Sequence, residues 1–367
     1  MELDKDQAAI LESVVKDVNK KQEISIGGYA GTGKTFLVRA IQQRLPHFAV
    51  CAFTGKAASV LRKKGLQEAQ TIHSLIYTPI PLEKNQVIFE RKSSVDCAGF
   101  IVDEASMVSS DVYSDLKFFG KPIIFVGDHG QLEPIGNNPN LMKNPDYKLE
   151  KVHRNAGEIA HFAEWIRLNK LPEEFPIENK VEFVPTYHKK DILSSKQTLC
   201  NIDQVICAYN ATRVEVNSKV RGFLGYQKKV ELGEKVICLR NNKKIGMFNG
   251  MQGIVTKLYK GNRFDLETEN GTYEKICYHP DVFGKEKLPE DLDLEDTNPF
   301  EFAYCITCHK SQADEFNSVL VLEQVCKNWD HVRWAYTAAS RAKEQLIWVG
   351  AYRKKSDLDV VQADEWF

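Results

Sequence analysis

Residues 28–35 read GYAGTGKT and fit the phosphate-binding pattern G-x-x-x-x-G-K-[ST] at every fixed position. An apolar segment, 24–26, leads into this loop, and residues 36–41 are expected to continue as a helix. Glycines let the backbone approach a phosphate closely, and the N–H groups at a helix N-terminus attract the anion. The strand, loop and helix together therefore predict a nucleotide-phosphate site, and they make a chance glycine-rich turn a poor alternative.

The fixed positions of the loop have separate expected roles. Lys34 can reach the β- and γ-phosphates of a nucleotide, and the hydroxyl of Thr35 can ligate Mg²⁺. The other predicted phosphate-binding residues are Gly28, Gly31, Thr32 and Gly33.

Two further apolar segments end in polar residues. Residues 99–106, GFIVDEAS, are typical of a buried parallel strand, and ligands bind outside the carboxyl ends of such strands. Asp103 could hold Mg²⁺ there, while Glu104 orients or deprotonates a water molecule. A solvated acidic turn is the alternative.

The next apolar segment, 122–128, leads into HGQLEPIG at 129–136. Gln131 could sense a γ-phosphate or hold the attacking water. Asp128 could equally cap the turn that follows. Three strand-to-loop units at this spacing predict an α/β fold with a RecA-like parallel sheet.

Composition sets wider limits. A chain of 367 residues is expected to form roughly two to three domains. Its formal net charge of −1 gives no overall basic field, so nucleic acid would have to bind in a local groove. The nine cysteines are irregularly spaced, and no apolar run approaches the ~20 residues of a membrane span. With no signal peptide at its start, the chain is expected in a reducing cytoplasm, away from membranes.

The string CITCH at 305–309 matches the haem-attachment pattern C-x-x-C-H. Haem attachment normally belongs to exported proteins, and the chain shows no export signal. Zinc is disfavoured because no second Cys/His pair lies nearby at the spacing of a zinc finger.

The order of the motifs resembles superfamily 1B helicases of the RecD and phage Dda type over nearly the whole chain. The matching segments are 6–10 (DQAAI, the Q motif), 52–58 (AFTGKAA, motif Ia), 71–74 (TIHS, motif Ib), 127–134 (GDHGQLEP, motif III), 153–155 (HRN, the motif IV arginine region), 306–312 (ITCHKSQ, motif V) and 335–343 (AYTAASRAK, motif VI). Their succession carries more weight than any one of them. Two positions depart from the family: Ala313 stands where motif V usually has glycine, and Ser340 stands where motif VI commonly has threonine.

The resemblance implies two RecA-like parallel-sheet domains with ATP between them. Residues 1–153 would form the first domain, with a β-hairpin pin inserted at 78–95. Residues 154–220 and 300–367 would form the second, and 221–299 a small SH3-like β-barrel with a short insertion. Within these bounds we expect a strand at 205–210, a helix at 212–220, and short strands at 236–239, 253–256 and 264–266. The chain is expected to return to the α/β sheet near Phe302.

The resemblance also implies an ATP-dependent DNA helicase that moves 5′ to 3′ on single-stranded DNA and uses ATP and Mg²⁺. Gln7 would hydrogen-bond adenine. Arg154 and Arg341 would act as arginine fingers on the γ-phosphate, although a surface cation is the commoner fate of an arginine.

The family's strand-contacting loops carry over to several positions of this chain. They are Thr54, Lys56, Thr71, His73, Thr307, His309 and Lys310, with Phe248 and Asn249 in the β domain. Lys56 also belongs to a basic cluster with Arg62, Lys63 and Lys64, whose alternative interpretation is a helix C-terminus before Gly65. Phe89 matches the pin aromatic that stacks at the fork, or else packs the hairpin on its own domain.

The expected partners are single-stranded and forked DNA, with replication, recombination or repair proteins as further candidates. The protein is expected to act as a monomer in a bacterial or phage-infected cell. Three rival functions stay open: a phosphotransferase of the polynucleotide-kinase type, a DNA-dependent ATPase that does not unwind, and a recruitment module that binds without turnover.

Overall fold

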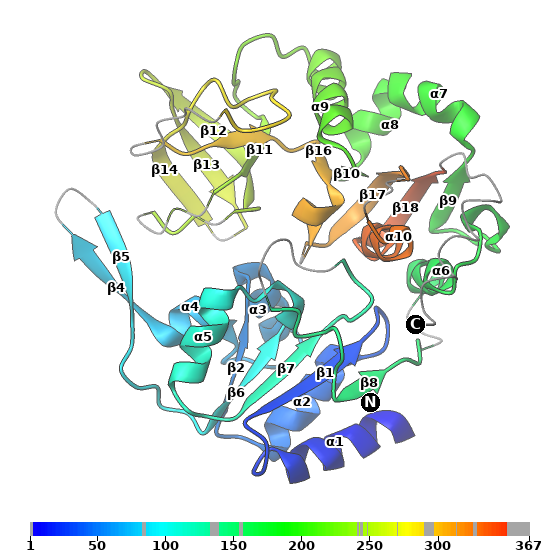
Figure 1. The fold of residues 1–367 in the computed structure, drawn as a ribbon. Coiled ribbons are helices and arrows are strands. Elements are labelled where there is room, and N and C mark those ends of the chain that lie inside the picture. The colour runs from blue at the N-terminus through cyan, green and yellow to red at the C-terminus, as the bar shows by residue number, and fades with distance from the viewer. Residues whose placement is uncertain are drawn as a thin grey trace.

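A computed structural model describes residues 3–82, 86–132, 139–153, 157–240, 242, 245–247, 249–269, 271–289, 297–312, 314–325 and 329–350. Two parallel sheets and one antiparallel sheet organise these residues, and a separate two-stranded hairpin projects from the first sheet's lobe (Figure 1). No helix in the described ranges is long and apolar enough to cross a membrane.

The first lobe is built on a six-stranded parallel sheet in the order β3-β2-β6-β7-β1-β8. Its strands are β1 Glu23–Gly28, β2 Phe48–Ala52, β3 Gln70–Thr71, β6 Gly99–Asp103, β7 Ile123–Gly127 and β8 Tyr147–Leu149. Its helices are α1 Lys5–Asp17, α2 Lys34–Arg44, α3 Gly55–Lys63, α4 Ile72–Ile76 and α5 Ser110–Phe118, with the 3-10 turn η1 Ala105–Met107. One apolar cluster joins α1, α2 and α3 to the sheet and another joins α4 and α5 to it, so both faces are covered. This explains why β6 and β7 are apolar and buried throughout.

The second lobe has a five-stranded parallel sheet in the order β16-β10-β17-β18-β9. The strands are β9 Val181–Val184, β10 Gln204–Cys207, β16 Cys305–Thr307, β17 Phe316–Leu322 and β18 Ala342–Val349. Helices α6 Glu158–Arg167 and α10 His331–Ala339 pack in one apolar cluster, and α7 Lys189–Ser194, α8 Lys196–Asn201 and α9 Asn210–Leu224 pack in the other. The short 3-10 turns are η3 Pro172–Glu174, η4 Thr186–His188 and η5 Cys308–Ser311.

The third unit is an antiparallel sheet in the order β14-β13-β12-β11-β15. Its strands are β11 Lys235–Cys238, β12 Gln252–Tyr259, β13 Arg263–Thr268, β14 Gly271–Cys277 and β15 Phe300–Phe302. Phe264 and Phe300 are fully buried in its own apolar core. The turn-rich, alternating sequence thus forms the expected β unit.

Two boundaries of this unit differ from those expected from the sequence. Helix α9 runs on to Leu224, four residues beyond its expected end. Strand β15 still pairs with β11 through Phe302, and the parallel sheet resumes at β16. In the second lobe, β10 ends at Cys207 and not at the expected residue 210, because the next helix begins at Asn210.

The hairpin consists of β4 Tyr77–Leu82 and β5 Gln86–Arg91, which pair with each other and with no other described strand. At its base, Arg91 forms an ion pair with Asp115 of α5 and lies 3.7 Å from the ring centre of Phe118. The hydroxyl of Tyr77 donates to the same Asp115 carboxylate at 2.5 Å. These contacts fix the base of the hairpin on the first lobe while its far end extends away from it (Figure 1).

Candidate functional site: a nucleotide cavity between two lobes

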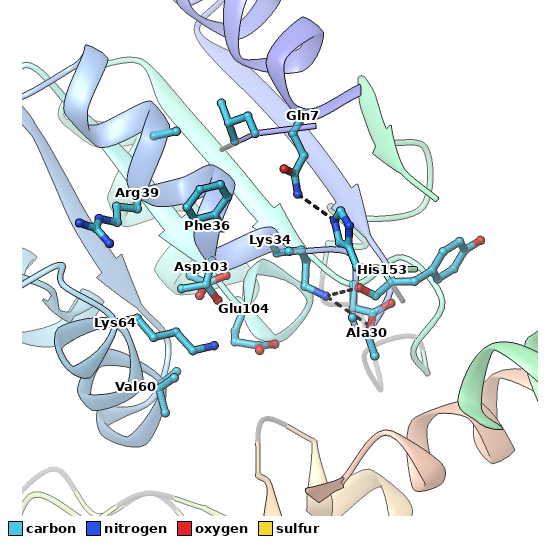
Figure 2. Close-up of a pocket in the computed structure, with 18 of the residues that line it drawn as sticks. Gln7, Ala30, Lys34, Phe36, Arg39, Val60, Lys64, Asp103, Glu104 and His153 are labelled. Atoms are coloured by element: carbon cyan, nitrogen blue, oxygen red, sulfur yellow. Dashed lines mark hydrogen bonds and ion pairs between the residues drawn. The ribbon is translucent and has the colours of Figure 1, made fainter. Parts of the chain in front are cut away.

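A cavity of about 1160 Å³ lies where the first lobe faces the second. It brings together residues that are far apart in the sequence. The predicted site residues that line it are Gln7, Gly31, Gly33, Lys34, Thr35, Asp103, Glu104, Gln131 and Arg341. Figure 2 shows Lys34 between the Asp103–Glu104 pair and the Gln7–His153 pair.

The phosphate loop has the backbone that its glycines predict. Gly31 and Gly33 have φ angles of 77° and 79°, in the left-handed region that favours glycine. A Cβ atom at Gly33 would lie 2.5 Å from Nε2 of Gln7, so a larger residue would also displace the Gln7 side chain. Gly28 and the buried Thr32 are not among the residues that line the cavity, and the Thr32 hydroxyl donates to the Tyr29 carbonyl within the loop.

Lys34 points back to its own loop. Its Nζ donates to the carbonyl of Gly28 at 2.7 Å and to that of Tyr29 at 3.0 Å. It also lies 3.7 Å from Oδ2 of the buried Asp128. These bonds use two of the three N–H donors of the ammonium group, so a γ-phosphate could take the third or compete with the loop carbonyls for the others.

Asp103 is the last residue of β6 and Glu104 follows it, at the carboxyl edge of the sheet, as the sequence predicts. Glu104 has a left-handed backbone, with φ of 54°, a conformation that is costly for a residue other than glycine and that concentrates at functional sites. Burial raises the pKa of Glu104 to about 7, and the neighbouring Asp103 charge adds to this rise, against the opposing charges of Lys34 and Arg341. Burial also raises the pKa of Asp103.

Asp128 and Gln131 occupy the turn after β7. The Asp128 carboxylate accepts from the Gly130 N–H at 2.9 Å, so Asp128 caps the turn that follows, as the capping interpretation describes. Its other oxygen faces Lys34 and accepts from the Gln131 amide at 3.3 Å. Asp128 therefore also lines the cavity. Its position directly after the apolar strand β7 is the sequence signal that could have predicted this.

At the other end of the cavity, Gln7 is buried on α1. Its Nε2 donates to the Thr32 carbonyl at 3.1 Å and lies 3.2 Å from Nε2 of His153. His153 adjoins the predicted finger Arg154, which lies outside the described residues. The sequence indicates no separate role for His153, and its half-buried contact with Gln7 is visible only in the fold.

Arg341 approaches from the second lobe, two residues after the end of α10. It is 5% exposed, and its guanidinium group donates hydrogen bonds within its own lobe. Nε donates to the Thr337 carbonyl at 3.0 Å, Nη1 to the Asp314 carbonyl at 3.2 Å, and Nη2 to the Ser340 hydroxyl at 2.9 Å. Ser340, the departure from the family's threonine, thus keeps a hydroxyl that holds this arginine.

The predicted strand-contacting residues lie outside this cavity, on several elements. The Thr54 and Thr71 hydroxyls cap helices: they accept from the Ala57 and Ser74 N–H groups, each at 3.1 Å. His73 lies in α4, 5.3 Å from the Tyr77 ring centre. Lys56 lies in α3, and nothing further is described of its side chain.

The remaining strand-contacting residues lie on the second lobe and the β unit. Thr307 ends β16, and the His309 ring centre is 4.9 Å from that of Trp329. Lys310 donates to the Asn249 side chain, which ties η5 to the β unit, and burial lowers the Lys310 pKa. Phe248 and Ala313 lie outside the described residues.

Two alternative interpretations gain support from the geometry. Helix α3 ends at Lys63 and Gly65 has a φ of 97°, so Arg62, Lys63 and Lys64 do lie at a helix C-terminus. Phe89 is half-buried against the apolar core of the first lobe, as the packing interpretation describes.

Comparisons with known proteins agree with the motif order. The AAA domain family matches residues 2–188, and the UvrD-like helicase C-terminal domain matches residues 302–349. The chain is 34% identical to the ATP-dependent DNA helicase dda of Enterobacteria phage T4 over 41% of its own length and 39% of that protein. It is 25% identical to the human ATP-dependent DNA helicase PIF1 over 93% of its length and 59% of that protein. It therefore spans less than two thirds of either relative.

A solved structure supports the fold. The Bacteroides Pif1 helicase in complex with ADP-AlF3 and ssDNA superposes with a TM-score of 0.55 at 21% identity, covering 99% of this chain and 97% of that one. The expected resemblance to Dda-type helicases is thus confirmed. Because the first family match covers slightly more than half of the 367 residues, the chain belongs to the AAA domain family.

Proposed function

We propose that the protein is an ATP-dependent DNA helicase that moves 5′ to 3′ along single-stranded DNA and separates duplex ahead of it. The observation that carries this proposal is the shared cavity, with a phosphate loop and two carboxylates on one lobe and Arg341 on the other. A nucleotide held between two lobes can link its cleavage to their relative movement. The named activities of the relatives, dda and PIF1, support the same conclusion.

ATP fits the cavity by its chemistry. Gln7 offers an amide for the adenine at one end, and the α2 N-terminus with Lys34 offers positive charge for the phosphates. The ADP-AlF3 named for the Bacteroides Pif1 complex is consistent with this choice. The loop around the phosphates would be formed by Gly28, Gly31, Thr32 and Gly33.

Mg²⁺ fits the same site because Thr35 and Asp103 provide a hydroxyl and a carboxylate, the hard oxygen ligands that it prefers. No cluster of three or more His, Cys, Asp or Glu side chains suited to a metal occurs in the described part of the chain. The remaining ligands would therefore be water and phosphate oxygens. Bound Mg²⁺ would neutralise charge that develops on the phosphates.

In the hydrolysis step, Glu104 would orient and deprotonate the attacking water, with Gln131 beside it. Lys34 would leave the loop carbonyls for the γ-phosphate, and Arg341 would turn from its own lobe toward the same group. We assign Arg154 as a second arginine finger because it follows His153, which reaches the cavity.

DNA would cross both lobes and meet Thr54, Lys56, Thr71 and His73 on the first. On the second it would meet Thr307, His309 and Lys310, with Phe248 and Asn249 on the β unit. These contacts would grip phosphates without reading sequence. The hairpin at 78–95 would act as the pin, with Phe89 at the fork.

We keep the division into a first lobe of residues 1–153 and a second lobe on both sides of a β unit, and we propose that the β unit is an SH3-like barrel. The expected bounds of the β unit, 221–299, shift to 225–302 because α9 ends at Leu224 and β15 ends at Phe302. The protein would work as a monomer on single-stranded and forked DNA, beside replication, recombination or repair proteins.

The test is unwinding of matched duplexes that carry a 5′ or a 3′ tail, made in DNA and in RNA, with ATP and Mg²⁺. Separation of the 5′-tailed DNA alone is the expected result. Release of free phosphate without strand separation would identify a non-unwinding ATPase. Phosphate transferred to a nucleic-acid end would identify a phosphotransferase, and binding without turnover a recruitment module.

A further inference from the structure

The turn at residues 128–132 belongs to the first lobe by sequence but is held by the second. Its partners there are α10 and the residue after η5. Arg333 donates to the carbonyls of His129 and Gln131 at 3.2 and 3.3 Å, the Thr337 hydroxyl accepts from the Leu132 N–H at 2.9 Å, and Gln312 donates to the Leu132 carbonyl at 2.9 Å. A displacement of α10 would therefore carry this turn with it.

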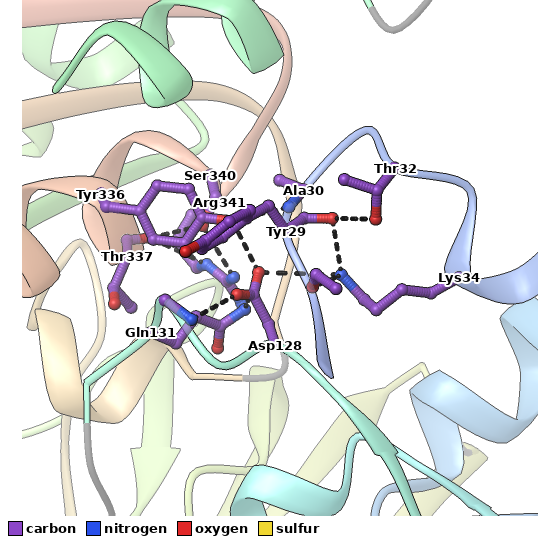
Figure 3. A network of polar contacts seen from close by, with 12 residues as sticks. Tyr29, Ala30, Thr32, Lys34, Asp128, Gln131, Tyr336, Thr337, Ser340 and Arg341 are labelled. Carbon is purple, nitrogen blue, oxygen red and sulfur yellow. Dashed lines mark hydrogen bonds and ion pairs between the residues drawn. The ribbon is translucent and has the colours of Figure 1, made fainter. Parts of the chain in front are cut away.

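Tyr336 makes the bond nearest to the phosphate site. Its hydroxyl donates to Oδ2 of Asp128 at 2.7 Å and accepts from the Ala30 N–H at 2.6 Å (Figure 3). The Tyr336 side chain is 1% exposed, so no solvent replaces these bonds. One hydroxyl on the second lobe thus joins the carboxylate after β7 to the backbone of the phosphate loop.

The bonded carboxylate oxygen is also the one nearest to Lys34. Its distance from Nζ is 3.7 Å, while Nζ donates to the loop carbonyls of Gly28 and Tyr29. A carboxylate that accepts a hydroxyl hydrogen bond attracts a neighbouring ammonium less than a bare one does. Removing the hydroxyl would leave Asp128 to draw Lys34 away from an incoming phosphate.

The position of the phosphate loop is tied to the same lobe by its variable residues. Arg167 of α6 lies 3.9 Å from the ring centre of Tyr29, on which the His129 ring packs with its centre 4.1 Å away. Tyr29 and Ala30 occupy positions that the phosphate-binding pattern leaves free. In this chain both are used to contact the second lobe.

We infer that Tyr336 is a positioning residue that sets Asp128 and Lys34 for phosphate binding and transmits movement of α10 to the phosphate loop. This inference rests on the proposed function, because it concerns ATP turnover at the same cavity. Gln312 follows His309 and Lys310, so strand binding at η5 would reach the turn at 128–132 through Leu132. Tyr336 therefore matters most for turnover that a bound strand stimulates.

The test is Tyr336→Phe, which removes the hydroxyl and keeps the buried ring. Tyr304→Phe is the matched control, since Tyr304 is a half-buried tyrosine of the same lobe whose hydroxyl accepts from the Lys235 N–H and lies outside the cavity. We expect Tyr336→Phe to lower kcat/KM for ATP about tenfold in the presence of single-stranded DNA, chiefly through KM, because a hydrogen bond to a charged group is lost. The control should stay within about twofold of the wild type.

A double-mutant cycle with Asp128→Asn separates positioning from a general loss of structure. If the hydroxyl acts through Asp128, Tyr336→Phe changes kcat/KM little in the Asp128→Asn background. Additive losses, or an equal loss in Tyr304→Phe, would overturn the inference. Should Tyr336→Phe not fold, Gln312→Ala, which removes the donor to the Leu132 carbonyl, must reduce the stimulation by DNA, and unchanged stimulation would overturn the inference. A wild-type protein without ATP turnover would instead refute the proposed function.

Discussion

The nucleotide cavity and the predicted strand-binding residues are organised in different ways. In the cavity, nine predicted residues from both lobes line one space. The strand-binding residues are spread over α3, α4, β5, β16, η5 and the β unit, and several have structural partners already. The first set lines one shared cavity, whereas no described member of the second set lines that cavity.

The order of the first sheet accounts for this difference. Strands β6, β7 and β1 are neighbours, so the three polar segments that follow them meet at one edge. Thr54 and Thr71 are instead the N-cap residues of α3 and α4. A threonine is favoured at an N-cap whether or not DNA binds. Convergence on one cavity is therefore stronger support for a function than residue type at scattered positions.

The largest effect is expected at the centre of the cavity. Lys34→Ala should lower ATP turnover by at least ~10²-fold and abolish unwinding, because the mobile cation for the γ-phosphate is lost. Phosphate release measured with and without single-stranded DNA checks this. Normal turnover would show that the cavity is not the hydrolysis site and would remove one side of the comparison.

A large loss of ATP turnover is also expected from a change on the facing lobe. Arg341→Ala should cut turnover by ~10³-fold while the affinity for ATP stays near that of the wild type, because a finger acts on the transition state. Binding of a fluorescent ATP analogue, measured beside turnover, separates the two quantities. Lys196→Ala, a change at an exposed cation of α8 on the same lobe that does not line the cavity, is the comparison variant.

Phe89 distinguishes packing from a role at the fork. Phe89→Ala should lower the free energy of unfolding by about 2 kcal/mol because a half-buried ring leaves the core. Phe89→Leu refills part of that space without an aromatic face. If the leucine variant regains stability but still unwinds poorly, while hydrolysing ATP on single strands, the pin role holds. Recovery of both properties would leave packing as the whole explanation.

The smallest effect concerns Thr54. Thr54→Ala should lower the free energy of unfolding by about 1 kcal/mol because the N-cap of α3 is lost, and Thr54→Ser should restore it. Urea unfolding measures this quantity. Weaker DNA binding by a Thr54→Ser protein of wild-type stability would show that the threonine also contacts the strand.

Local patterns in the sequence predicted the parts of the molecule that depend on local chemistry. The phosphate loop, the buried β6 and β7 strands and the turn-rich β unit all occur where expected. The bond from Tyr336 to Asp128 could not be predicted, because it joins residues 208 positions apart. The bond from Arg341 to the Asp314 carbonyl could not be predicted either, because it depends on the path of a neighbouring loop. Phe89 shows the same limit, since a single aromatic in a hairpin fits a core and an exposed fork equally well.

The hairpin has a consequence for solubility. Pro79 and Pro81 alternate along β4, so their missing N–H groups fall on the same side of the strand. An unpaired strand edge is otherwise a template on which a second chain can add by backbone hydrogen bonding. Because two donors are absent from β4, a second chain would add along this strand less readily than along β5, which contains no proline.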